Sequence, residues 1–280
     1  MKPHLKRKLQ AQYNGFLQTP TLFSGLYDDM EFFQIDREFP DHLNLSEGFE
    51  IPENIRLGQR MEYYFQEAVD ENRRFRMIAK NLQIIHQKET LGEIDFLLWD
   101  TAKLQVLHIE LAYKFYLFIP DQNRHWTENW QGVNLRDNLH KKLDKFRQQQ
   151  LPLLYKKEAL PQLLELDIQP REVIQKVCLK GQLFLPLKAK LTTPRINASA
   201  VMGNWFPLEK LEMVGAGKAE IFIPPKNDWV SIPDNDLAEW LTPSEAKELL
   251  FYLKKNQQST LIWLRFPGGE LQRHFVVWWD

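Results

Sequence analysis

The sequence predicts an α/β protein with a central mixed sheet flanked by helices, followed by a mostly β C-terminal region. Apolar residues recur at three- and four-residue spacing over 57–68, as on a helix with one apolar face. Two apolar runs, 94–99 and 104–117, are joined by the polar segment 100–103, as in a hairpin. Beyond about residue 170, short apolar runs bounded by turn residues predict strands in place of helices.

The composition is that of an ordinary globular protein. The chain has 280 residues, of which 44% are hydrophobic and 26% charged, and its formal net charge is −1. This balance argues against a surface uniformly coated in positive charge for duplex binding, but it is compatible with local basic patches. The single cysteine, Cys178, excludes an internal disulfide, and its apolar neighbours predict a buried thiol.

Two features bear on location. The first residues are basic without an apolar run behind them, so no secretory signal is expected. Every apolar run is too short to cross a bilayer. We therefore expect a cytoplasmic protein that does not enter a membrane.

We divide the chain into three regions: an N-terminal helical layer (1–54), a core (55–168) and a β-rich C-terminal region (169–280). Within the core, one amphipathic helix precedes the hairpin. A second amphipathic helix follows it and ends near Pro152. The core therefore carries the alternation of helix and strand that an α/β fold requires.

The hairpin gathers charged side chains on one face. With the turn centred on residues 101–102, Asp95 faces His108, and Glu93 faces Glu110. Opposing residues share a face of the sheet, and so do alternate residues of a strand. The other face collects apolar side chains and is expected to meet the core: Ile94, Phe96, Leu98, Leu107, Ile109, Leu111, Tyr113 and Phe115.

In this register Asp95 and Glu110 are diagonal neighbours, roughly 7–8 Å apart at the backbone. Two such carboxylates can share a cation, without which their repulsion in a half-buried site would be costly. Carboxylate oxygens suit Mg²⁺ or Mn²⁺, which retain waters and take up phosphate oxygens. Lys114, on the same face, would orient the attacking water or neutralise charge on the phosphate. Solvated charges on an exposed face, with a Glu110–Lys114 ion pair or an ion pair between Glu93 and a lysine, are the alternative.

Three segments carry a resemblance: Leu57-Gly58-x-Arg60-x-Glu62, Thr90-Leu91-Gly92-Glu93-x-Asp95-Phe96-Leu97 and His108-x-Glu110-Leu111-Ala112-x-Lys114-Phe115-Tyr116-Leu117. Together they resemble the PD-(D/E)xK, or restriction-endonuclease-like, nuclease superfamily, and within it a bacterial family of unknown function that is thought to contain this core. The Gly-Glu-Ile-Asp segment is the more specific half of the match.

The resemblance covers about residues 55–155. It implies that Asp95 and Glu110 are metal ligands, that Lys114 is the catalytic lysine, and that Glu62 is an outer ligand from the first core helix. The chain departs from the superfamily at Ala112, where the usual lysine would stand two residues after the acid. Lys114 lies two positions further along the same face, so a migrated lysine and an inactive descendant both remain open.

Four further residues are secondary candidates for substrate contact or support of the site. Lys142 and Gln149 border the apolar stripe of the second core helix and could touch a substrate phosphate. Glu93 and His108 lie beside the acids on the hairpin, where His108 could position water. The alternatives are a solvated helix face and a structural histidine.

These observations predict a nuclease that uses Mg²⁺ or Mn²⁺ to hydrolyse phosphodiester bonds in nucleic acid, with DNA as the expected substrate. The sequence leaves DNA versus RNA, and a homodimer, open. A catalytically inactive nuclease-like fold that binds nucleic acid or protein is the alternative. A nucleotidyltransferase has an acidic pair like Glu93-x-Asp95, but the upstream Gly-Ser turn of that class is missing here.

Overall fold

A mixed nine-stranded sheet forms the centre of the computed structural model, which describes residues 3–34, 44–191 and 195–279. The strand order is β3-β4-β5-β7-β8-β11-β10-β9, and β6 also pairs with β5. Its strands are β3 (Phe75–His86), β4 (Glu89–Asp100), β5 (Gln105–Phe118), β6 (Trp130–Gly132), β7 (Ile174–Pro186), β8 (Val201–Pro207), β9 (Glu220–Phe222), β10 (Thr260–Arg265) and β11 (Leu271–Val277). The β5–β7, β7–β8 and β8–β11 pairs are parallel and the others antiparallel, which confirms the predicted mixed sheet.

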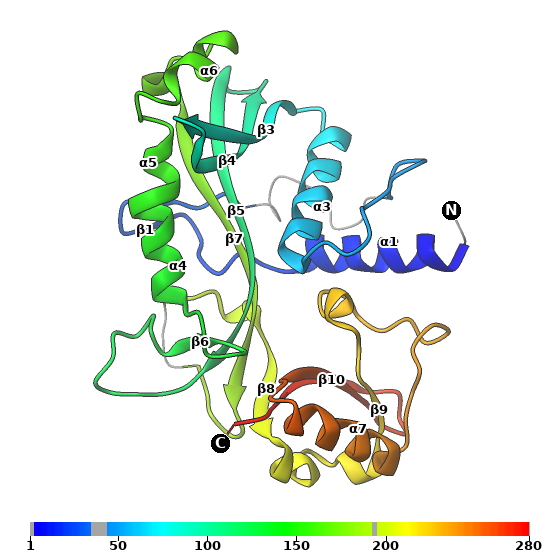
Figure 1. The fold of residues 1–280 in the computed structure, drawn as a ribbon. Coiled ribbons are helices and arrows are strands. Elements are labelled where there is room, and N and C mark those ends of the chain that lie inside the picture. Colours follow the sequence, from blue (N-terminus) through cyan, green and yellow to red (C-terminus); the bar gives the residue numbers. More distant parts are fainter. Residues whose placement is uncertain (1–2, 35–43, 192–194, 280) are drawn as a thin grey trace.

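Helices cover both faces of the long strands β5 and β7 (Figure 1). The α-helices are α1 (Pro3–Gln18), α3 (Leu57–Glu71), α4 (Leu139–Lys145), α5 (Leu151–Leu153), α6 (Leu160–Glu165) and α7 (Pro243–Lys255). α1 and α3 pack on one face, where Tyr13 and Tyr64 join the largest apolar cluster. α4 packs on the other face, where Leu139 and Leu143 meet Val177 of β7. The described part of the chain has no helix that is long and apolar enough to cross a membrane.

The predicted hairpin is present, but its register differs by two residues from the expected one. Leu97 pairs with His108 and Phe96 with Ile109, so Asp95 does not face His108 and Glu93 does not face Glu110. The loop between the strands is longer than predicted because Asp100 caps it. The carboxylate of Asp100 accepts from the amides of Ala102 and Lys103 at 3.1 and 3.3 Å. A shift of two residues preserves which face each side chain takes, because side chains alternate with period two.

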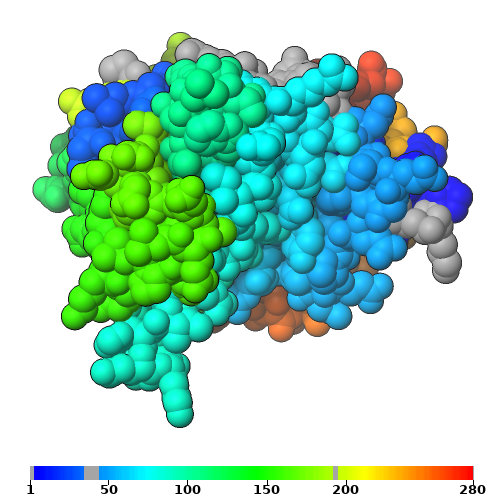
Figure 2. Space-filling view, turned by 90° about the horizontal axis from the view of Figure 1, so that it is seen from above, coloured from blue at the N-terminus to red at the C-terminus, as the bar shows by residue number. Residues whose placement is uncertain are grey.

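The expected core face is confirmed except at Ile94. The other seven residues of that face lie in the cluster under α1 and α3. Ile94 instead packs with Leu153 and Leu163 of α5 and α6. Two features explain the exception: β4 pairs with β5 only from Phe96 onward, so Ile94 lies outside that pairing, and the neighbouring strand β3 has Asn81 in a left-handed conformation with φ 52°. In Figure 2 the segment of α6 lies beside the residues of β3 and β4.

The second core helix is confirmed, with one irregular turn. After α4 the chain continues as a π-helix, η1 (Phe146–Gln150), and then as α5. The amide of Leu151 donates to the carbonyl of Phe146, five residues earlier. Pro152 follows at once, and a proline disfavours the regular bond pattern of the turn before it. The wide turn changes which side chains of this helix face the sheet.

The regions on either side of the core are tied into the same sheet. β7, which begins the C-terminal region, pairs with β5 from Leu107↔Ile174 to Leu117↔Phe184, so hydrogen bonds cross the expected 168/169 boundary. Before residue 54, α1 is followed by the two-residue strands β1 (Leu26–Tyr27) and β2 (Met30–Glu31). Among the residues described in this region, the expected helical layer consists of α1. Cys178 is buried, as predicted.

Candidate active site

The site forms at the point where β4 and β5 separate, which we call the fork. β4 pairs with β5 only up to Phe96↔Ile109, and the next residues on each strand are Asp95 and Glu110. The Asp95 amide N–H points to Glu110 Oε1 at 3.4 Å, and the Leu111 amide donates to Asp95 Oδ2 at 2.8 Å. The two carboxylates predicted to share a site are therefore adjacent, and they lie on the same side of the fork.

Burial sets the electrostatics of this pair. Desolvation, together with the charge of Glu110, raises the pKa of Asp95 to about 7. Desolvation raises the pKa of Glu110 to about 7 as well, and the nearby lysine Lys142 opposes both shifts. Glu110 is fully buried, whereas Asp95 keeps partial exposure. Two carboxyl groups with raised pKa values, side by side where two strands separate, are a candidate functional site.

A hydrogen-bonded chain orients Glu110. His108 Nε2 lies 2.7 Å from Glu110 Oε1, and the side-chain amide of Gln150 donates to Glu110 Oε2. Gln175 Nε2 donates to the carbonyl of Leu151 at 2.7 Å and lies 2.9 Å from His108 Nδ1. Because Nδ1 then accepts, the histidine carries its proton on Nε2 and donates to the carboxylate. Burial lowers the pKa of His108 to about 4, so its ring is neutral near pH 7.

Lys142, on α4, is a lysine whose charge acts on both acids. Its Nζ donates to Gln150 Oε1 at 2.9 Å and lies 3.8 Å from the centre of the Phe146 ring. Burial lowers its pKa to about 8, and the charges of Asp95 and Glu110 oppose that fall. Lys142 therefore acts on both carboxylates through its charge, and it shares the side chain of Gln150 with Glu110.

Lys114 shares the face of Glu110 but is engaged elsewhere. Its Nζ donates to Asp137 Oδ2, in the loop after β6. Its charge acts on Lys142, whose pKa it helps to lower. The predicted catalytic lysine thus lies near the site without contacting the acid pair among the described contacts.

Glu62 and Glu93 are two further acids near Asp95. Asn81 Nδ2 donates to Glu62 Oε2 at 3.1 Å, and burial, with the charges of Asp95 and Glu93, raises the pKa of Glu62. Glu93 lies 3.5 Å from the amide nitrogen of Gln83 across the β3–β4 pair. Glu62 is thus within electrostatic reach of Asp95, as an outer acid.

Gln149, predicted to touch substrate, is exposed on α4–η1, and Gln150 takes the inward position. In a regular helix the residue seven beyond Lys142 would share its face. The π-turn inserts about one extra residue, so the residue eight beyond Lys142 arrives there instead. The proline two residues later was the available signal for this irregularity. Gln175 and Asn81 carried no signal, because their roles depend on pairing between distant strands.

A groove of about 600 Å³ opens in front of the acids. Glu62, Lys114 and Lys142 line it, together with the β5 segment 111–115. Asp95 and Glu110 lie behind its wall, since Asp95 binds the amide of the lining residue Leu111. The groove therefore borders the acid pair.

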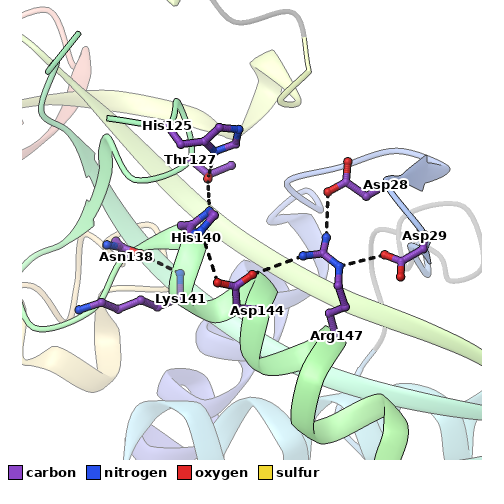
Figure 3. Close-up of polar contacts among 9 residues, drawn as sticks. All are labelled: Asp28, Asp29, His125, Thr127, Asn138, His140, Lys141, Asp144 and Arg147. Carbon is purple, nitrogen blue, oxygen red and sulfur yellow. Dashed lines mark hydrogen bonds and ion pairs between the residues drawn. The ribbon is translucent and has the colours of Figure 1, made fainter. Parts of the chain in front are cut away.

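Ion pairs hold α4 in place at its outer side (Figure 3). Arg147 contacts Asp28 at 2.8 Å and Asp29 at 3.0 Å in the β1–β2 hairpin, and Asp144 at 3.3 Å on its own helix. Because α4 also carries Lys142, these pairs help to fix the distance between this lysine and the sheet.

The start of α4 is tied to the preceding loop in the same view (Figure 3). The hydroxyl of the buried Thr127 lies 2.7 Å from His125 Nδ1 and 2.9 Å from His140 Nδ1. Asn138 caps the helix by accepting from the amide of Lys141 at 2.8 Å. The helix that brings Lys142 to the acids is therefore fixed at its beginning and along its outer side.

Asp95 and Glu110 supply part of the coordination shell that a divalent ion needs. Within residues 3–34, 44–191 and 195–279, no three His, Cys, Asp or Glu side chains are arranged to hold a metal. Mg²⁺ is commonly bound through one or two carboxylates, with waters and substrate phosphates completing its shell. Asp95 and Glu110 supply two buried oxygen donors that repel each other without a cation. The pair therefore fits a hard cation whose remaining ligands come from water and substrate.

Comparison with protein families gives a match to a family described as a domain of unknown function (DUF1853), over residues 30–277. The chain belongs to the DUF1853 family. No curated protein and no solved structure matches it. The DUF1853 match contains every residue of the fork, from Glu62 on α3 to Gln175 on β7. The candidate site is therefore part of the DUF1853 domain itself and not of an added segment.

Proposed function

We propose that this DUF1853 protein is a metal-dependent nuclease with a restriction-endonuclease-like core, which hydrolyses phosphodiester bonds in nucleic acid, with DNA as the expected substrate. The contact between Asp95 and Glu110 carries the proposal. A buried and a largely buried carboxylate from adjacent strands meet beside a lysine, behind the wall of a groove that carries more positive than negative charge. An acidic pair of this kind is costly to a fold unless a cation or a proton compensates it.

Asp95 and Glu110 would hold a Mg²⁺ or Mn²⁺ ion, which when bound would polarise the phosphate and lower the pKa of a water. The chain's own residues keep this pair in position. His108 and Gln150 fix the two oxygens of Glu110, and the Leu111 amide fixes Asp95. Orientation by neighbouring donors is the usual way in which proteins tune such ligands.

Lys142 is the better candidate for the proton-transferring lysine. Its pKa of about 8 lies close to the working pH, where a general acid or base is most effective. Its charge acts directly on both carboxylates. Lys114, paired with Asp137 at the groove wall, would instead contact a substrate phosphate.

A second function is supported by two observations. Among the described residues there is no group of three metal-ligating side chains, and Lys114 is occupied by Asp137. A catalytically inactive fold that binds nucleic acid through the same groove has these properties too. Assays of cleavage and of binding separate the two functions.

The test is cleavage of labelled single-stranded and duplex DNA and RNA with Mg²⁺, with Mn²⁺ and with EDTA. Asp95→Asn preserves shape but removes a metal-binding charge, so we expect activity to fall at least about 100-fold. Glu89→Gln, on the exposed end of the same strand, is the matched control and retains activity. Binding without cleavage under any divalent ion favours the inactive fold. Equal cleavage by Asp95→Asn and by the natural protein refutes the assignment of the site.

A further inference from the structure

The groove exposes a stretch of sheet edge. β4 pairs with β5 only as far as Ile109, and β6 joins the same edge only from Tyr116. Residues 111–115 between them line the groove. The Leu111 amide points to this side, and backbone groups two residues apart point the same way. The N–H and C=O groups of Tyr113 therefore face the groove as a donor and an acceptor.

The groove is positively charged although the whole chain is not. Five cationic side chains and two acidic ones line it: Arg56, Lys114, Arg136, Lys142 and Lys226, with Glu62 and Asp137. In the part of the chain that the structure describes, Arg56, Arg136 and Lys226 form no ion pair with a carboxylate. The net charge of the chain is −1, so this cationic lining is a local feature. It matches a polyanion.

Two aromatic side chains border the groove but are largely buried. Trp229 and Phe115 line it with only 5% and 8% of their surface exposed, and their ring centres are 5.5 Å apart in an edge-to-face contact. Lys226 Nζ lies 5.7 Å from the centre of the Trp229 ring. The open β5 edge instead offers hydrogen-bonding groups, which single-stranded bases can meet with their free Watson–Crick edges. A volume of about 600 Å³ holds a nucleotide-sized group but not a section of duplex.

We propose that this groove binds an unpaired strand of nucleic acid, with a base at the open β5 edge and its phosphates at Arg56, Arg136 and Lys226. The inference deepens the proposed function and rests on it for the class of ligand. Phe115 lies five residues beyond Glu110 along one strand, which is roughly 16 Å. The bound base would thus lie a few nucleotides from the acid pair, and the cleaved bond would lie in single-stranded nucleic acid.

Gly58 allows the groove to be closed without disturbing the fold. It lines the groove in the first turn of α3, and a Cβ built on it meets nothing within 4 Å. Gly58→Phe places a ring at the groove and replaces a poor helix former by a better one. Gly268→Phe is the matched control, because a Cβ there also meets open space, at the β10–β11 turn.

The experiment measures fluorescence anisotropy of a labelled single-stranded oligonucleotide, a blunt duplex and a polyglutamate peptide in EDTA, where nothing is cleaved. We expect the single strand to bind at least 10-fold more tightly than the duplex or the peptide. Gly58→Phe should weaken single-strand binding at least 10-fold, and Gly268→Phe should not. Lys226→Ala should lower the slope of affinity against salt by about one phosphate contact.

Duplex or peptide binding as tight as single-strand binding overturns the proposal, and so does unchanged binding by Gly58→Phe. Failure of the proposed function looks different. If the protein binds the single strand through the groove but cleaves nothing with Mg²⁺ or Mn²⁺, the proposed hydrolysis is refuted and single-strand binding in the groove is not. If the protein cleaves blunt duplex and Gly58→Phe does not affect that cleavage, single-strand binding in the groove is refuted and the hydrolysis is not.

Discussion

Asp95 and Glu110 replace the sheet's own hydrogen bonds at the point where β4 and β5 separate. The side chain of Glu110 on β5 lies 3.4 Å from the backbone N–H of Asp95 on β4, and the side chain of Asp95 accepts from the backbone of Leu111 on β5. Each acid thus contacts the other strand. The fork and the candidate metal site are therefore the same structure, and a change in either acid bears on both.

Asp95→Asn should make the metal-free protein more stable near neutral pH. The asparagine retains an oxygen for the Leu111 amide and removes a buried charge beside Glu110. We expect the free energy of unfolding at about pH 8 to rise by on the order of 1 to 3 kcal/mol. Denaturant unfolding in EDTA measures it, and a variant that is less stable than the natural protein contradicts the account.

The same comparison has a defined pH dependence. The folded protein keeps protons on Asp95 and Glu110 up to about pH 7, whereas an unfolded chain releases them near pH 4. The folded state binds more protons between these values, so this pair lowers stability as the pH rises through the window. The advantage of Asp95→Asn should therefore shrink toward zero at acid pH. His108 acts in the opposite direction, because its pKa is lowered to about 4 and its contribution is lost as the pH falls from about 6.5 toward 4.

His108 should be a neutral ring with its proton on Nε2. Gln175 holds its amide nitrogen toward Nδ1 because the Leu151 carbonyl fixes the orientation of that amide. Nitrogen-15 NMR of the imidazole at neutral pH measures the tautomer directly. Gln175→Leu removes the donor and should yield a mixture of tautomers. A natural protein whose proton resides on Nδ1 contradicts this arrangement.

Lys142→Met and Lys114→Met should differ in their effects on cleavage. Lys142 acts on both acids, so its loss should lower kcat by about 100-fold or more. Lys114 is bound to Asp137 at the groove wall, so its loss should mainly raise KM. Steady-state kinetics with a labelled oligonucleotide separates the two. The reverse pattern returns the catalytic role to Lys114.

Arg147→Gln should have a small effect on stability. Its partners Asp28 and Asp29 are exposed, and exposed ion pairs each contribute at most about 1 kcal/mol. Thermal unfolding at low and at high salt tests this, and the difference between variant and natural protein should narrow as salt screens the pairs. A large loss that salt does not change would mean that the packing of α4 depends on this arginine.

The sequence was sufficient for the α/β class, for the hairpin and for the faces of its strands. Alternation along β5 placed Glu110 and Lys114 together even though the predicted register was wrong by two residues. A register shift of two residues leaves each side chain on its predicted face of the sheet, so the two side chains remain on one face. The loop length itself depended on Asp100 accepting two amides, which residue patterns do not reveal.

The supporting residues could not be predicted from local patterns. Gln150 faces the acids only because a π-turn precedes Pro152, and a regular period selected Gln149 instead. Gln175 reaches His108 because β7 pairs with β5 in parallel, and no spacing along the chain reports such a pairing. Periodicity locates faces of single elements, whereas the site is assembled from several elements that are distant in sequence.

The most direct test is the anomalous density of a crystal soaked in Mn²⁺ at a pH above 7. We expect a peak between the carboxylates of Asp95 and Glu110, about 2.0 to 2.3 Å from an oxygen of each. The same soak of Asp95→Asn should leave that position empty. If saturating Mn²⁺ gives no peak there, or a peak only at other carboxylates, Asp95 and Glu110 do not form the proposed metal site.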